Sequence, residues 1–206
     1  EAIITAELAR EMLKTNWIKL ELISDEEMLL PDPIELYDAC KYLVKNKFKI
    51  FAYCSDDPIL CKRLEDVGCE IVMPLISPIG SGLGIRNEHN LEIIRKMCSR
   101  KVFVDAGIGK PSDASKIMEM GFDGVLLNSS VARSLNPEDM ANAMRLAVIT
   151  THRAAVVTNM RWEHLDCETG VWTIPEAPIG LSEGYMKSGR EFLMKLPKNL
   201  LNDLCS

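Results

Sequence analysis

Several features that define common protein classes are missing from this sequence of 206 residues. Acidic residues outnumber basic ones by 30 to 24, so the chain has no general electrostatic attraction to nucleic acid or to an anionic membrane. No apolar run approaches the roughly 20 residues that a membrane-spanning helix needs, and no signal peptide opens the chain. We therefore expect a cytoplasmic protein with neither a membrane nor a nucleic acid partner.

The spacing typical of metal sites is also missing. None of the seven cysteines forms a CxxC pair, and the three histidines, His89, His152 and His164, are scattered along the chain. A metal site or a redox pair stays an alternative, but the apolar neighbours of the cysteines favour reduced, mostly buried thiols. We expect no metal.

The composition that remains is typical of a folded protein. Hydrophobic residues make up 47% of the chain and charged residues 26%, and the length suits one to one and a half domains. The first residue is Glu1 rather than Met, as in a processed chain or a fragment.

Apolar patterns with helix and strand periods alternate up to about residue 150. Ser55 or Asp56 can cap a helix that begins at Pro58. The short, almost continuously apolar strands are typical of a parallel sheet covered on both faces, either an open doubly wound sheet or a (β/α)8 barrel. The predicted helices are 5–14, 34–46, 58–66, 88–98, 112–119 and 137–148, and the predicted strands are 17–23, 48–53, 70–75, 101–105 and 123–127.

After about residue 150 the pattern changes. The segments VWTIP and REFLMKL indicate β-structure, and the alternation of strand and helix stops. We therefore predict two parts, residues 1–150 and residues 151–206, with the boundary at about 150–158.

Lys19 lies within the apolar strand WIKLE, two residues before Glu21. Residues i and i+2 of a strand point to the same face, so the amine and the carboxylate share one side of the sheet. A desolvated lysine there can lose its proton near neutral pH and attack a carbonyl to form an imine, with Glu21 moving protons. The alternative, which the spacing alone favours, is an edge-strand lysine paired with Glu21 in solvent.

Two loops rich in glycine follow strands. In SPIGSGLGI, Gly80, Gly82 and Gly84 can bring backbone N–H groups close to an anion, although the spacing differs from the GxGxxG dinucleotide motif. A turn that needs positive φ explains one of these glycines better than three. In VDAGIGKPSD, Asp105 ends a strand and is a candidate acid or base, and the loop after it suits a phosphate.

The next strand is followed by Asn128, Ser129 and Ser130, small hydrogen-bond donors. Donors after two successive strands are typical of the phosphate site of (β/α)8 barrels. Six motifs in this order, running from about residue 5 to residue 148, resemble bacterial thiazole synthase: WIKLE, LLPDP, YCSDDP, SPIGSGLGI, VDAGIG and GFDGVLLNSSVA.

The resemblance implies a (β/α)8 barrel, here incomplete, with its third to eighth strands present and a small, mostly β segment at the C-terminus. It implies that Lys19 forms an imine with 1-deoxy-D-xylulose 5-phosphate, and that Glu21 and Asp105 act as acid and base. It also implies thiazole phosphate as the product, dehydroglycine as a second substrate, sulfur from the thiocarboxylate of a ubiquitin-like carrier protein, a homo-oligomer and no cofactor. The implied contacts to the substrate phosphate are Gly80, Ala106, Gly107, Asn128 and Ser129.

Residues from about 155 to 204 resemble a fragment of the catalytic domain of phage-type tyrosine recombinases. In this resemblance Lys187 matches a lysine of a hairpin in that domain. Residues 151–206 carry six basic and seven acidic residues, which argues against DNA binding. Besides a thiazole synthase, the sequence therefore leaves two alternatives, a non-catalytic truncated fusion and a DNA-binding recombinase fragment.

Overall fold

A computed structural model describes residues 1–25, 27, 29–150, 160–176 and 191–205. The chain divides into two compact units. Unit 1 comprises Glu1–Gly109 and Met120–Ser129, and unit 2 comprises Lys110–Glu119 and Ser130–Ser206. The predicted boundary at about 150–158 falls largely on residues outside the described ranges, so it stays a prediction.

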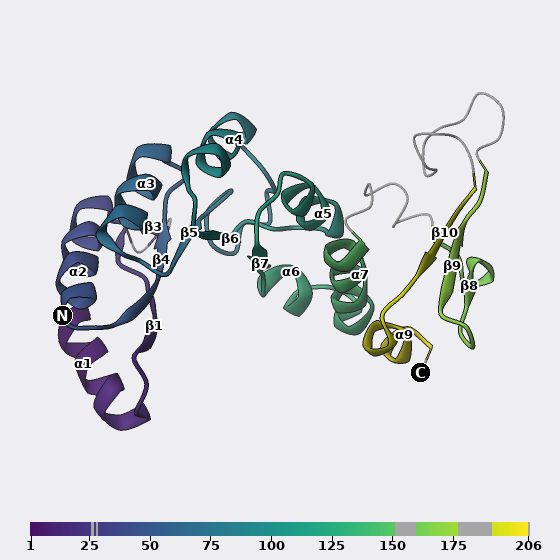
Figure 1. Ribbon diagram of the computed structural model, residues 1–206, viewed down its shortest axis with the longest axis horizontal. Helices are drawn as coiled ribbons and strands as arrows, with labels where there is room; N and C mark the ends of the chain where they lie inside the picture. The colour runs from purple at the N-terminus through teal and green to yellow at the C-terminus, as the bar shows by residue number, and fades with distance from the viewer. Residues whose placement is uncertain (26, 28, 151–159, 177–190, 206) are drawn as a thin grey trace. The chain divides into compact units, whose positions relative to one another are not determined.

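A parallel sheet of five strands forms the centre of unit 1, in the order β1-β4-β5-β6-β7 (Figure 1). The first strand ends at Leu20, three residues before the end of the predicted strand, and is followed by a short antiparallel pair, β2 (Ile23–Asp25) and β3 (Leu30–Pro31). The strands of the sheet are β1 (Trp17–Leu20), β4 (Lys49–Cys54), β5 (Ile71–Pro74), β6 (Lys101–Asp105) and β7 (Gly124–Leu126).

Helices cover one face of this sheet, and α2 and α3 both pack against β4. Asp57 caps α3, because its carboxylate accepts the amides of Ile59 at 2.8 Å and Leu60 at 3.3 Å. The prediction that α3 begins at Pro58 is confirmed, whereas the prediction of Ser55 or Asp56 as its cap is wrong. The helices of unit 1 are α1 (Ala2–Leu13), α2 (Pro33–Lys45), α3 (Pro58–Val67) and α4 (Glu88–Met97).

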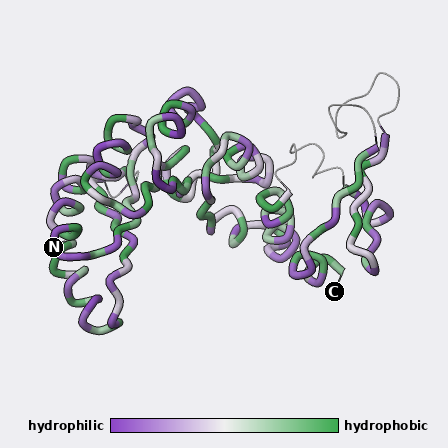
Figure 2. Tube along the Cα trace, in the orientation of Figure 1, coloured by the Kyte–Doolittle hydropathy of each residue, from purple (hydrophilic) through white to green (hydrophobic). Residues whose placement is uncertain are grey.

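The core of unit 1 lies between these helices and the sheet, where alternate residues such as Ile50, Ala52 and Val104 are fully buried. The hydropathy colouring shows helices that alternate between hydrophilic and hydrophobic residues (Figure 2). The predicted α/β fold with a partial barrel is confirmed. Its parallel sheet has five strands within the described residues, whereas the third to eighth strands of a barrel make six.

Unit 2 combines helices with a small antiparallel sheet in the order β10-β9-β8. Seven of its buried residues form one cluster, in which Trp172 is the largest and Leu200 belongs to the C-terminal helix. The predicted β-structure of the C-terminal segment is confirmed. The elements are α5 (Pro111–Glu119), α7 (Pro137–Thr150), the 3-10 turn Trp162–His164, β8 (Leu165–Asp166), β9 (Val171–Ile174), β10 (Phe192–Lys195) and α9 (Lys198–Leu204).

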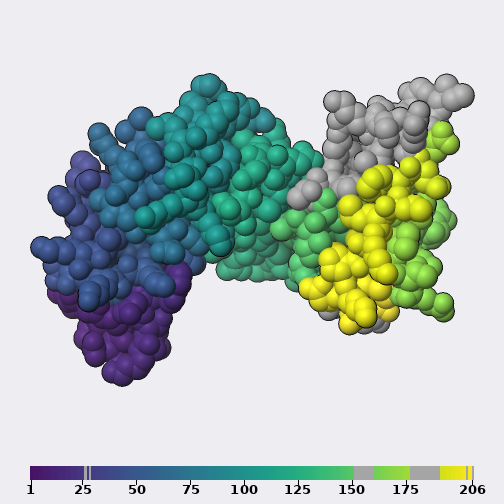
Figure 3. Space-filling model, in the orientation of Figure 1, coloured from purple at the N-terminus to yellow at the C-terminus, as the bar shows by residue number. Residues whose placement is uncertain are grey.

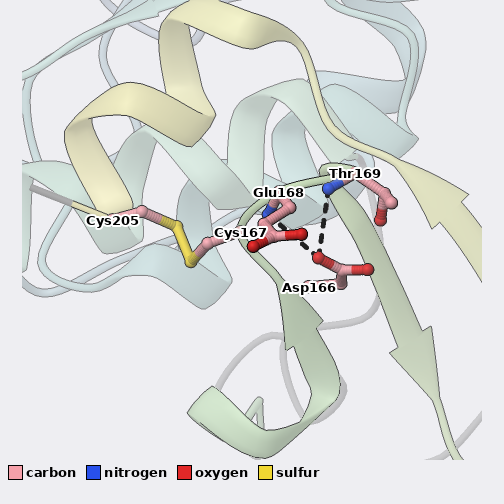
Figure 4. Close-up of a disulfide and its surroundings, with 5 residues drawn as sticks. All are labelled: Asp166, Cys167, Glu168, Thr169 and Cys205. Carbon is pink, nitrogen blue, oxygen red and sulfur yellow. Dashed lines mark hydrogen bonds between the residues drawn. A yellow bond between two sulfur atoms is a disulfide. The ribbon is translucent and has the colours of Figure 1, made fainter.

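A disulfide between Cys167 and Cys205 joins the turn after β8 to the end of α9 (Figure 4). The C-terminal residues, in yellow, lie in front of the light green β8–β9 hairpin in the space-filling view (Figure 3). The prediction of reduced thiols is therefore wrong for this pair, which is 38 residues apart in the sequence. The other five cysteines, all in unit 1, are buried and free.

No helix among the described residues is long and apolar enough to cross a bilayer. The same residues contain no group of three or more His, Cys, Asp or Glu side chains arranged to hold a metal ion.

Candidate functional site

The carboxyl ends of β1, β6 and β7 border a cavity of about 350 Å³ in unit 1. Parallel strands bring these ends to one edge of a sheet, where α/β proteins place their ligands. All eight residues predicted for the site line this cavity: Lys19, Glu21, Gly80, Asp105, Ala106, Gly107, Asn128 and Ser129. The sequence did not predict the apolar part of the lining, which comes from Ile79, Ile108, Leu126 and Leu127.

Lys19 is paired with two carboxylates. Its Nζ lies 2.7 Å from Oδ2 of Asp105 and 3.3 Å from Oε2 of Glu21. Glu21 directly follows the end of β1, whereas Asp105 ends β6, which lies three strands away in the sheet. The ion pairs therefore draw together the carboxyl ends of two strands that share no backbone hydrogen bonds.

Each alternative for Lys19 describes part of this geometry. β1 is an edge strand within the described sheet, and the lysine is paired with Glu21, as the edge-strand alternative predicts. The side chain is 40% exposed and also reaches Asp105, which that alternative did not include. Burial lowers the pKa of Lys19, but the hydrogen bond and charge of Asp105, followed by those of Glu21, raise it above its ordinary value. The direction of this shift agrees with the alternative of a paired, protonated lysine and not with that of a desolvated amine whose pKa is lowered.

The SPIGSGLGI loop adopts left-handed backbone conformations at all three of its glycines. The φ angles are 75° at Gly80, 58° at Gly82 and 69° at Gly84. The expectation that positive φ explains only one of them is therefore wrong, because each needs a conformation that side chains with a Cβ rarely adopt.

The loop after β6 packs against the SPIGSGLGI loop so closely that neither Gly107 nor Gly109 has room for a side chain. A Cβ at Gly107 would overlap Oγ of Ser77, and one at Gly109 would overlap the carbonyl oxygen of Gly82. The amide of Gly84 donates to the carbonyl of Gly107 at 2.8 Å. The packing of the two loops therefore requires glycine at positions 107 and 109. The sequence alone had related this loop to phosphate binding.

Ala106 has a φ of 74°, in the left-handed region, although it carries a Cβ. Such strain persists where the surroundings fix the backbone, and it is most frequent at functional sites. Ala106 directly follows Asp105 and lines the cavity, so this strained position lies next to the carboxylate that is paired with Lys19.

Asn128 and Ser129 enter the cavity from the end of β7. Ser129 is the first residue of the one-turn helix α6 (Ser129–Ala132). Together with the two glycine loops, these residues border the cavity with small polar groups and backbone. Lys19 is the one cationic side chain among the described residues that line it.

Sequence reasoning missed Tyr53 of β4, which lies beside the site. The Nζ of Lys19 is 5.7 Å from the centre of the Tyr53 ring. Alternation along β4 places Tyr53 on the same sheet face as Phe51, which is paired with Lys19 across the strands. The motif YCSDDP contains this tyrosine, but only the strand register shows that it faces the lysine.

The parallel sheet and a lysine at its carboxyl-terminal edge define a protein of the (β/α)8-barrel class, with a site built on an amine and two carboxylates. The family model described as thiazole biosynthesis protein ThiG matches residues 1–167. The chain therefore belongs to this family.

Two solved structures show the same fold. The BexX/CysO complex of Amycolatopsis orientalis contains a chain with 26% sequence identity and a TM-score of 0.68, and the match covers 72% of this chain. A designed cube-shaped protein cage matches 73% of this chain with a TM-score of 0.51 and 13% identity, which indicates the fold alone. The present chain covers 60% of the chain in the first structure and 50% of that in the second.

The family match ends at residue 167, within the C-terminal segment. None of the matches given above supports a resemblance of residues 155–204 to tyrosine recombinases. Lys187, the residue on which that resemblance placed a role, lies outside the described residues.

Proposed function

We propose that this chain acts as a thiazole synthase of thiamine biosynthesis, forming the thiazole phosphate through an imine on Lys19. The proposed substrates are 1-deoxy-D-xylulose 5-phosphate, dehydroglycine and sulfur delivered as a carrier-bound thiocarboxylate. The observation that carries the proposal is the position of Lys19 between two carboxylates, 2.7 and 3.3 Å from its Nζ, in a cavity bordered by two glycine-rich loops.

Imine formation requires that the ammonium group first lose a proton. Asp105 is the nearer acceptor, at 2.7 Å, and its side chain is 12% exposed, so the proton need not reach bulk water. The neutral amine then adds to the ketone carbonyl to give a carbinolamine. Loss of the hydroxyl as water, with a proton returned by a carboxylic acid, forms the C=N bond. Glu21 is the second group that can move a proton at the amine.

The phosphate of the ketose would lie in the same cavity as the amine. We assign it to Gly80, Ala106, Gly107, Asn128 and Ser129, whose backbone and side chains border the cavity. Successive amides in turns with positive φ suit an anion, and the φ angles of 75° at Gly80, 74° at Ala106 and 87° at Gly107 support this assignment.

The sulfur donor would be a ubiquitin-like carrier protein whose C-terminal thiocarboxylate reaches the cavity. The solved structure that contains the similar chain is a BexX/CysO complex, which supports a protein partner. We further propose that the chain acts as a homo-oligomer.

Borohydride trapping tests the proposal. Incubation with 1-deoxy-D-xylulose 5-phosphate and reductant should add one reduced sugar phosphate, which peptide mapping should place on Lys19. The Lys19→Ala variant should lose the adduct. Lys101→Ala is the matched control, because Lys101 is exposed and begins β6 at the other end of the strand; this variant should keep the adduct.

A folded chain without the adduct would contradict the proposal and favour a non-catalytic fusion. The observation that favours this second candidate is the open sheet, in which β1 and β7 are edges among the described strands. A (β/α)8 barrel has no such edges when it is closed.

A further inference from the structure

Tyr53 brings a phenol hydroxyl into the interior of unit 1. The residue is fully buried, and its Oη has no hydrogen-bond partner among the described residues. Leaving a buried donor unpaired costs folding free energy, which a phenylalanine of the same shape would avoid. Stability therefore does not explain this buried hydroxyl, which indicates another role for it.

The surroundings of this hydroxyl are charged. The ring of Tyr53 lies 5.7 Å from Nζ of Lys19, whose two partners are the carboxylates of Glu21 and Asp105. Burial, followed by the charges of Glu21, Asp105 and Cys54, raises the pKa of Tyr53 above its ordinary value. At neutral pH the phenol therefore keeps its proton and can only donate to these carboxylates.

The hydrogen bonds of the two carboxylates depend on whether Lys19 is protonated. While Lys19 is an ammonium group, it donates to Asp105 and Glu21. When it loses its proton, both carboxylates lose that donor and the local net charge falls by one. A phenol hydroxyl that turns towards them stabilises this more negative state, and so favours loss of the proton.

We propose that Tyr53 is a positioning residue for the amine of Lys19, whose hydroxyl donates to the Glu21–Asp105 carboxylates once the amine is neutral. The ring holds the amine in place, and the hydroxyl lowers the pH at which the amine becomes a nucleophile. The use of that amine rests on the function proposed above. The proton equilibrium is a property of the protein without substrate, so it can be tested separately.

Competitive acetylation with acetic anhydride measures this equilibrium directly. The full chain is labelled at a series of pH values, and the acetylated fraction of Lys19 is compared with that of exposed Lys96 by mass spectrometry. We expect Tyr53→Phe to shift the apparent pKa of Lys19 upward by about one unit, which leaves about tenfold less neutral amine at pH 7. The thermal stability of this variant should be unchanged or higher.

Tyr42→Phe is the matched control. The hydroxyl of Tyr42 is on α2 and donates to Glu7 at 3.2 Å, outside the cavity, so the Lys19 profile should not move. An unchanged or downward-shifted profile in folded Tyr53→Phe would overturn the proposal. Failure of imine trapping in the wild type, with the upward shift present, would instead count against the proposed function alone.

If Tyr53→Phe does not fold, the hydroxyl is altered with 3-fluorotyrosine instead of being removed. In a chain whose other tyrosines, Tyr37, Tyr42 and Tyr185, are changed to phenylalanine, the analogue is incorporated at Tyr53 alone. It keeps the hydroxyl but is a stronger donor, so the pKa of Lys19 should fall relative to the same chain with ordinary tyrosine. No fall would overturn the proposal.

Discussion

Units 1 and 2 are stabilised in different ways. Unit 1 buries residues from four of its five sheet strands and from the helices that cover them, and its five cysteines remain free thiols inside that core. Unit 2 has one cluster of seven buried residues and a covalent link between Cys167 and Cys205. A small core supplies little surplus stability, so a cross-link has most value there. The candidate site lies entirely in unit 1, so changes in unit 2 should separate stability from chemistry.

The largest effect should come from the centre of the small core. Trp172→Ala removes a side chain that is 1% exposed. We expect the free energy of unfolding to fall by about 3–5 kcal/mol, as for other buried tryptophans. Hydrogen exchange should speed up in β9 and β10 while β4 stays protected. Trp162, at 66% exposed, is the control, and Trp162→Ala should change little. Equal deprotection of β4 would show that the units unfold together.

Removing the disulfide should have the next largest effect. The Cys167→Ser, Cys205→Ser double variant frees a loop of 38 residues, for which chain entropy predicts a loss of about 2–4 kcal/mol. Calorimetry should show a lower Tm for unit 2, and a reducing agent should reproduce this in the wild type but leave the double variant unchanged. Insensitivity of the wild type to reduction would mean that the cross-link adds nothing to unit 2.

Glu65 makes a comparable contribution within unit 1 without a covalent bond. It is 4% exposed and accepts from Lys62 at 2.6 Å and from the Arg100 amide at 2.7 Å. Burial raises the pKa of Glu65, but these hydrogen bonds, with that of Ser99, bring it below its ordinary value. Glu65→Gln should lower the free energy of unfolding by about 1–3 kcal/mol at pH 7.

The pH dependence of Glu65 has a definite sign. Because its pKa is lower in the folded state, the charge stabilises unit 1 above the ordinary pKa of a glutamate, and this contribution disappears as the pH falls through the folded value. Urea unfolding at neutral and acidic pH should show the gap between wild type and variant closing in acid. Asp66→Asn breaks only an exposed ion pair with the same Lys62, so its effect should stay below about 1 kcal/mol.

The smallest effect should come from Asp166, the counterpart of Glu65 in unit 2. Its carboxylate accepts the amides of Glu168 at 2.9 Å and Thr169 at 3.0 Å in the turn after β8 (Figure 4). Hydrogen bonds from Thr169 and Glu168 lower the pKa of Asp166, so its contribution is also lost as the pH falls. In thermal unfolding, the Tm should be highest for the wild type, lower for Asp166→Asn and lowest for Asp166→Ala, because Asn keeps the acceptor oxygen. A larger loss for Asn than for Ala would contradict this order.

Local sequence signals predicted most of the helices and strands, because they depend on neighbouring residues. Pro58 marked the start of α3, yet the cap is Asp57, because proline in the first helical position leaves the N-cap to the residue directly before it. The disulfide could not be predicted, since 38 residues separate its cysteines and no short spacing marks them. The small β2–β3 pair, which begins at the last residue of the predicted strand 17–23, was missed for lack of a long apolar alternation.

The candidate site shows the same limit more clearly. Alternation along the predicted strand 17–23 put Lys19 and Glu21 on one face, and the glycine motifs indicated which loops lie near them. The 2.7 Å contact with Asp105 depends on strand order and sheet curvature, which no local pattern contains. This contact is the main cause that raises the pKa of Lys19, and neither alternative drawn from the sequence included it. Tyr53 faces the same amine for the same long-range reason.

One measurement tests whether a single cavity joins the amine of Lys19 to a phosphate site. Borohydride trapping is run with 1-deoxy-D-xylulose 5-phosphate and with the same sugar lacking the phosphate, at equal concentrations. Both carry the ketone that Lys19 attacks, so they differ only in the group assigned to Gly80, Ala106 and Gly107. Trapping of the phosphorylated ketose alone, on Lys19, is the predicted result. Equal trapping of both sugars, or adducts spread over exposed lysines, would contradict it.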